Sequence, residues 1–138
     1  MEIILPSNIV TRPHYLNKVA PFISKNILKV FTGQRRVGKS YLLFQIIAQI
    51  QKQEPANPII YINKEDLNFS FIKEAGDLHE YVLKNKSENS KTYVFIDEIQ
   101  DISNFETALR SLLLHEDLDI YCTGSNANLL SGDIAGHL

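Results

Sequence analysis

The sequence has little of what would indicate export, disulfide bonding or a membrane span. Its 138 residues contain a single cysteine, Cys122, which excludes an intrachain disulfide and fits a reducing compartment. The N-terminus lacks a basic region followed by an apolar run, and the longest apolar stretch is interrupted by Gln45 and Gln49. We therefore expect no membrane association and a cytoplasmic location.

Metal-ligand clusters are also missing, and the net charge is small. The four histidines show no ligand spacing with Cys122 or with one another, and the net charge is −2. Residues 1–39 hold seven Lys and Arg against one acid, a net of +6, whereas the remainder holds seven against fifteen, a net of −8. A bound nucleotide alone would explain this basic third, so nucleic-acid binding stays open without being indicated.

A phosphate-binding loop is the main feature that the sequence does contain. Residues 33–40 read GQRRVGKS and fit the pattern G-x-x-x-x-G-K-[ST]. The two glycines permit backbone angles and close approaches that a side chain would block, so that N–H groups can surround a polyphosphate. Lys39 would bring its charge to the outer phosphates, and the Ser40 hydroxyl is suited to Mg²⁺.

The expected cofactor is therefore ATP with Mg²⁺. The expected binding residues run from the loop into the next helix: Gly33, Gln34, Arg35, Arg36, Val37, Gly38, Lys39, Ser40 and Tyr41. Loop arginines usually point to solvent. Arg35 and Arg36 are therefore expected either to face solvent or to contact a phosphate or a neighbouring group.

Strands and helices alternate along the rest of the chain. Apolar runs predict strands at residues 27–32, 59–62, 92–96 and 118–122. Helices are expected at residues 11–25, 41–50 and 71–84, and after a capping box at 103–106. Near-continuous apolar strands indicate a parallel sheet with helices on both faces, whose ligands bind beyond the carboxyl ends of the strands.

Two polar segments follow strands and so fall at that edge. Asp97 and Glu98 come after four apolar residues, which is the Walker B pattern. Asp97 would hold Mg²⁺ together with Ser40, and Glu98 would polarise the attacking water, although acidic pairs after strands also cap loops or helices. After the fourth strand, Asn126 is expected to sense the γ-phosphate, with Ser125 as the alternative and an ordinary turn as the other reading.

Together these segments resemble a known family. The loop, the DEIQ of residues 97–100 and the TGSNA of residues 123–127 look like the prokaryotic AAA-type ATPases whose ATPase domain precedes a nuclease-like domain of unknown function. Arg12 matches the helix that opens that family. The resemblance implies a three-layer α/β P-loop NTPase fold of the additional-strand topology, in which the fourth strand lies between the first and third. Its catalytic residues would be Glu98, Lys39 and Asn126.

The resemblance also predicts how the chain is organised. Residues 1–138 would be the N-terminal part of the ATPase domain, with residues 1–26 as a strand and helix packed on it, and the family's fifth strand would be missing. Without it the strand at 27–32 would be a sheet edge, which favours self-association. The expected function is ATP binding and hydrolysis coupled to movement of downstream domains. The alternatives are a nucleotide-gated switch and, less in keeping with Glu98, a small-molecule phosphotransferase.

Overall fold

A parallel sheet forms the centre of the protein. The computed structural model describes residues 28–32 and 38–124. Their strands are β1 (Lys29–Thr32), β2 (Ile59–Asn63), β3 (Thr92–Asp97) and β4 (Leu118–Gly124), arranged in the order β1-β4-β3-β2. All neighbouring pairs are parallel. The position of β4 between β1 and β3 confirms the predicted additional-strand topology.

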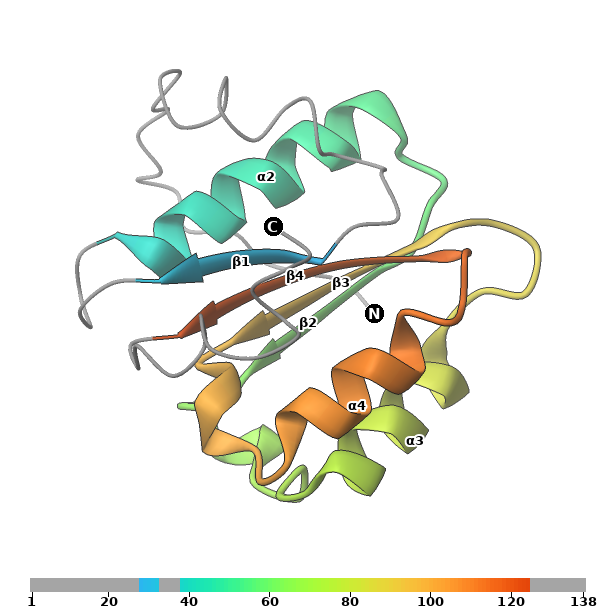
Figure 1. Cartoon of the computed structure of the whole chain (residues 1–138). Coiled ribbons are helices and arrows are strands. Elements are labelled where there is room, and N and C mark those ends of the chain that lie inside the picture. The colour runs from blue at the N-terminus through green and yellow to red at the C-terminus, as the bar shows by residue number, and fades with distance from the viewer. Residues whose placement is uncertain (1–27, 33–37, 125–138) are drawn as a thin grey trace.

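Helices cover both faces of this sheet (Figure 1). On one face lies α2 (Lys39–Gln53), and on the other lie α3 (Ala75–Asn85) and α4 (Phe105–Leu112). Two short 3₁₀ turns, η2 (Leu67–Phe69) and η3 (Ile99–Asp101), follow β2 and β3. The predicted three-layer α/β fold is therefore confirmed.

Each face of the sheet has its own hydrophobic core. Under α2 the core is made by Leu43, Ile46, Ile47, Ile50, Ile59, Tyr93, Phe95 and Tyr121, and the Phe95 and Tyr121 rings stack at 4.6 Å. The larger core under α3 and α4 includes Leu78, Val82, Val94, Ile96, Leu109, Leu112 and Ile120. Full burial of each such side chain stabilises the folded state by about 1.5–3 kcal/mol relative to leaving it exposed. The folded state therefore favours the orientation of each element that turns these residues inward.

The burial of the strands follows their place in the sheet. Every residue of β3 and β4 is buried, as expected for inner strands covered on both faces. β1 and β2 are the outer strands of the described sheet, and Val30, Phe31 and Tyr61 on them are only partly buried. Lys29 is buried although it lies on an outer strand of the described sheet, and it forms an ion pair with Asp119 of β4.

Some predicted boundaries were wrong for local reasons. The helix expected from residue 71 begins at Ala75, where Asp77 accepts hydrogen bonds from the backbone N–H groups of Lys73 (3.1 Å) and Glu74 (3.0 Å). The capping box expected at Ser103 does not form. The N-cap of α4 is Asn104, with φ of 57° and no capping hydrogen bond from its side chain. The helix predicted at residues 11–25 and the N-terminal extension lie outside the described residues.

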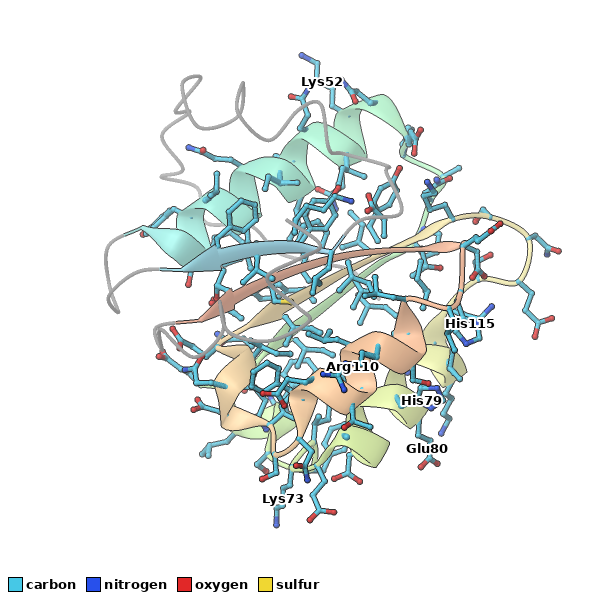
Figure 2. The ribbon with its side chains drawn as sticks, in the orientation of Figure 1. Lys52, Lys73, His79, Glu80, Arg110 and His115 are labelled. Atoms are coloured by element: carbon cyan, nitrogen blue, oxygen red, sulfur yellow. The ribbon has the colours of Figure 1, made fainter. Side chains whose placement is uncertain are left out.

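Charged side chains lie on the outside of the two helical layers. Figure 2 shows Lys52 at one extremity of the molecule and Lys73 and Glu80 at the other, all directed away from the sheet. His79 of α3 and His115 after α4 are neighbours, with ring centroids 6.5 Å apart. Within residues 28–32 and 38–124, no helix has the length and apolar character needed to cross a bilayer.

Candidate functional site

Ser40 and Asp97 meet at the carboxyl edge of the sheet, although 57 residues separate them in the sequence. Ser40 lies in the first turn of α2, and Asp97 is the last residue of β3. The Ser40 hydroxyl donates a hydrogen bond of 2.5 Å to Oδ2 of the Asp97 carboxylate. The helix N-terminus adds a positive dipole end at the same place. The structure thus brings the expected hydroxyl and carboxylate metal ligands together.

Two further hydroxyl groups, from β2 and β4, complete the surroundings of the Asp97 carboxylate. Tyr61 of β2 donates a hydrogen bond of 3.1 Å to Oδ2, and Thr123 of β4 donates one to Oδ1. Burial first, and then the nearby Asp97 charge, raise the pKa of the Tyr61 phenol. The phenol consequently keeps its proton and remains a donor to Asp97 at neutral pH.

Glu98 has an unusual backbone conformation directly after Asp97. Its φ of 62° lies in the left-handed region that non-glycine residues seldom adopt, and its side chain is buried. The Glu98 N–H donates to Oγ1 of Thr123 at 3.1 Å, and the Gln100 amide donates to Oε2 of Glu98 at 2.5 Å. Such strained residues cluster at functional sites, where surrounding contacts maintain them.

The described end of the phosphate-loop motif has the backbone that the motif requires. Gly38 caps α2 with a φ of 89°, a conformation that glycine adopts without strain. Tyr41 is exposed on the first turn of α2, and its ring lies edge-on to Phe44 at 6.3 Å. The expected site residues Gly33 to Val37, Ser125 and Asn126, and the side chain of Lys39, lie outside the part of the chain that the structure describes.

The chemistry around Asp97 suits a cation. Asp97 is only 3% exposed, and its carboxylate accepts hydrogen bonds from the Ser40, Tyr61 and Thr123 hydroxyls. Within the described ranges none of these donors carries a positive charge, and a buried carboxylate is costly without one. Mg²⁺ prefers oxygen ligands and typically takes one or two carboxylates beside substrate phosphates, so this oxygen set fits it.

Comparison with protein families agrees with this arrangement. A family model described as an AAA domain matches residues 25–138. The chain belongs to the AAA domain family. It is therefore a nucleotide-binding, P-loop ATPase-like domain.

Sequence relatives of this AAA domain occur in bacteria and archaea. An uncharacterised protein of Haemophilus influenzae is 38% identical over 128 residues, which cover 91% of this chain and 32% of that protein. An uncharacterised protein of Methanocaldococcus jannaschii is 40% identical over 116 residues, which cover 82% of this chain and 24% of that protein. The AAA domain thus spans a third or less of the length of these relatives.

Solved structures show the same fold. Caenorhabditis elegans PCH-2 matches with a TM-score of 0.69 and 15% identity, over 94% of this chain and 42% of that one. A Rhizobiales Trip13 matches with a TM-score of 0.55 and 14% identity, over 91% of this chain and 50% of that one. At these identities the likeness concerns the fold of the AAA domain alone.

Sequence reasoning missed three residues of the site. In the sequence, Tyr61 reads as one more apolar position of a strand, and Thr123 as part of the polar segment that follows the strand predicted at residues 118–122. Gln100 stands in the sequence only as part of the DEIQ motif. The signal that was present for Thr123 is its place at the carboxyl end of a strand, where polar side chains of a parallel sheet converge.

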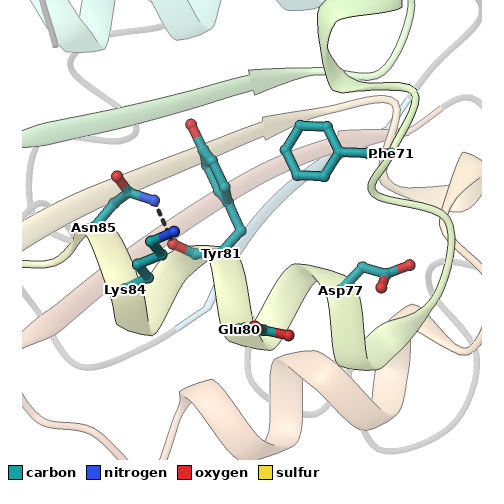
Figure 3. A pocket seen from close by; sticks show the side chains of 6 residues that line it. All are labelled: Phe71, Asp77, Glu80, Tyr81, Lys84 and Asn85. Atoms are coloured by element: carbon teal, nitrogen blue, oxygen red, sulfur yellow. Dashed lines mark hydrogen bonds between the residues drawn. The ribbon is translucent and has the colours of Figure 1, made fainter.

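A separate pocket lies on the α3 side of the AAA domain (Figure 3). It has a volume of about 380 Å³ and is lined by Phe71, Asp77, Glu80, Tyr81, Lys84 and Asn85. The Phe71 and Tyr81 rings form its apolar wall, with centroids 5.7 Å apart. None of the predicted site residues lines this pocket.

Proposed function

We propose that this AAA domain binds ATP with Mg²⁺ and hydrolyses it, and that its nucleotide state drives movement of further domains. One observation carries the proposal: Ser40 at the start of α2 lies 2.5 Å from Asp97 at the end of β3. This places a hydroxyl and a carboxylate beside a helix N-terminus, where anionic phosphates bind favourably.

Binding is assigned to the phosphate loop and its helix. The backbone of residues 33–38 would surround the phosphates, with Arg35 and Arg36 as further candidates for phosphate contact, and Lys39 would place a positive charge against the outer phosphates. Tyr41, exposed on the first turn of α2, would lie beside the same ligand. Ser40 and Asp97 would hold Mg²⁺, which when bound offsets the negative charge of the phosphates.

Hydrolysis is assigned to Glu98 as the group that accepts a proton from the attacking water. The hydrogen bond from the Glu98 N–H to Thr123 fixes the Glu98 backbone, so its side chain leaves the main chain at a defined position next to Asp97. Asn126 would contact the γ-phosphate or position the water, with Ser125 as the alternative. A general base of this kind contributes about 10²–10⁴-fold to the rate.

A nucleotide-gated switch with little turnover is the second candidate. It is favoured by the hydrogen bond of 2.5 Å from Gln100 to the Glu98 carboxylate, because that bond competes with a catalytic water for the same group. The two functions differ in one measurable respect. A switch binds ATP and changes state without a steady release of phosphate, whereas an ATPase releases phosphate continuously.

The same proposal includes the segments on either side of the ATPase domain. Residues 1–26 would pack on the ATPase domain, and a nuclease-like domain would follow it in the longer protein, which agrees with relatives that are more than three times the length matched here. We also propose that the domain self-associates through β1 and is located in the cytoplasm. Light scattering over a range of concentrations would measure the self-association.

Titration of ATP by calorimetry tests the binding step directly. Lys39→Ala should sharply weaken ATP binding in the presence of Mg²⁺, because it removes a positive charge expected at the phosphates. Lys52→Ala is the matched control, since Lys52 is exposed in the last turn of the same helix. If Lys39→Ala bound ATP as tightly as the wild type, the phosphate-loop assignment would be wrong.

A further inference from the structure

The carboxylate of Asp97 is held on both of its oxygens by groups from neighbouring strands. Tyr61 of β2 donates to Oδ2 at 3.1 Å, and Thr123 of β4 donates to Oδ1. Ser40 also donates to Oδ2, but it lies at the start of α2, next to the phosphate loop. The two strand residues therefore fix the plane of the carboxylate independently of the loop.

Thr123 has a second hydrogen bond that Tyr61 does not have. Its fully buried Oγ1 accepts the N–H of Glu98 at 3.1 Å. Glu98 has a φ of 62°, which is a costly conformation for a residue with a side chain. One hydroxyl group thus fixes both the carboxylate of Asp97 and the strained backbone from which the Glu98 side chain projects.

The contacts of Tyr61 separate its hydroxyl from its ring. The ring packs against Phe44 of α2 at a centroid distance of 5.4 Å, while the hydroxyl reaches Asp97. A phenylalanine at this position would keep the ring contact and lose only the hydrogen bond. This allows the effect on the site to be measured without disturbing the core.

We propose that Tyr61 and Thr123 are positioning residues for the metal and the general base. Tyr61 orients Asp97 alone, whereas Thr123 orients Asp97 and Glu98 together. This inference rests on the proposed function, in which Asp97 holds Mg²⁺ and Glu98 accepts the proton of the water. Groups that orient metal ligands typically change metal affinity or activity by about 10–100-fold when they are removed.

The test compares Tyr61→Phe, Thr123→Val and Thr123→Ser with the wild type. ATP affinity is measured by calorimetry with Mg²⁺ and again with EDTA, and kcat and KM are measured separately. Tyr61→Phe should weaken the Mg²⁺-dependent affinity by about 10-fold or more, leave the affinity in EDTA unchanged, and keep kcat close to the wild-type value at saturating Mg²⁺ and ATP. Thr123→Val should reduce both the Mg²⁺-dependent affinity and kcat by about 10–100-fold. Thr123→Ser keeps the hydroxyl group and should therefore keep both values close to those of the wild type.

Tyr93→Phe is the matched control. Tyr93 also lies on the α2 face of the sheet, but its hydroxyl donates to Glu54 after the end of α2 rather than to Asp97. It should leave the Mg²⁺ dependence of ATP binding unchanged. Thermal unfolding of all variants then separates a loss of stability from a loss of positioning.

The outcomes distinguish this inference from the proposed function. If the wild type binds ATP in a Mg²⁺-dependent way and Tyr61→Phe and Thr123→Val keep that dependence and kcat, the positioning roles are overturned while the proposed function stands. Equal losses with Mg²⁺ and with EDTA would also overturn them. A wild type that binds no ATP under either condition would overturn the proposed function and this inference with it.

Discussion

Lys29 of β1 and Asp119 of β4 form an ion pair in the interior of the sheet, at the end remote from Asp97. The Tyr121 hydroxyl donates to the same carboxylate at 2.7 Å, and the Lys29 ammonium lies 4.8 Å from the centroid of the Tyr121 ring. Burial lowers the pKa of Lys29, and Asp119 opposes that shift. Asp119 therefore favours the charged form of Lys29, whereas burial disfavours it.

Removal of one partner should cost more than removal of both. We expect Asp119→Asn to lower the free energy of unfolding by about 3–5 kcal/mol, because the buried ammonium would lose its carboxylate. The double variant Lys29→Met with Asp119→Leu should lose less, since neither charge is then buried. Urea unfolding measures both.

The half-buried pair Lys86 and Asp117, with N and O 2.8 Å apart, is the control for the fully buried pair. Asp117→Asn should cost less than about 1 kcal/mol, as is usual for ion pairs near the surface. A double variant at Lys29 and Asp119 that is less stable than Asp119→Asn would contradict the prediction.

Glu98→Gln should separate binding from turnover. The amide keeps the size of the side chain but cannot accept the proton of water, so steady-state phosphate release should fall by about 10²–10⁴-fold while ATP affinity is retained. Glu80→Gln, at an exposed position of α3, is the control. Normal turnover of Glu98→Gln would show that another group is the base, and the absence of turnover in the wild type with any partner would favour the switch.

The same substitution should have opposite effects at two glycines. Gly76 lies in α3, and a Cβ built there meets no atom within 4 Å. Gly76→Ala should therefore stabilise the protein by about 0.5–1 kcal/mol. Gly38→Ala should destabilise it by about 1–2 kcal/mol, because φ at Gly38 is 89°. Thermal unfolding decides, and a stabilising Gly38→Ala would contradict the assigned backbone.

Cys122 provides a pH-dependent prediction. Burial raises the pKa of its thiol from 9.0 to about 12, so between these values the folded chain keeps a proton that the unfolded chain loses. Stability should therefore fall as the pH rises above 9.0. At about pH 10.5 the loss attributable to the thiol is about 2 kcal/mol.

The comparison with Cys122→Ala isolates this thiol from the other alkaline groups. The free energy of unfolding of the wild type should drop further between about pH 8 and about pH 10.5 than that of the variant, by about 2 kcal/mol. Parallel pH profiles of the two proteins would contradict a buried thiol with a raised pKa.

The parts of the structure that depend on local periodicity could be predicted from the sequence. The apolar run of residues 92–96 and the helical spacing from Phe105 to Leu112 each place many side chains in the core, so one misread residue changes little. The parallel order followed from the same runs together with the resemblance. Asp97 and Ser40 could be predicted because a phosphate-binding site requires a hydroxyl and an acid at characteristic positions in the sequence.

The features that depend on distant or rare contacts could not be predicted in this way. The ion pair of Lys29 could not be predicted because its partner Asp119 is 90 residues away in the sequence. Ser103 has the sequence of a helix cap, but the left-handed conformation of Asn104 starts α4 one residue later. The role of Tyr61 could not be predicted because tyrosine is a common residue in strands.

The two buried hydrogen-bonded contacts of β4 limit how this strand can move. Asp119 near its amino end is tied to Lys29 of β1, and Thr123 near its carboxyl end is tied to Asp97 of β3. A slip by one residue would turn both side chains to the opposite face, and a slip by two would carry them about 7 Å from their partners. While the protein is folded, β4 therefore cannot slide along its neighbours. Any change of shape that follows the proposed hydrolysis of ATP has to begin outside this strand, with β4 and its contacts to β1 and β3 as a fixed reference.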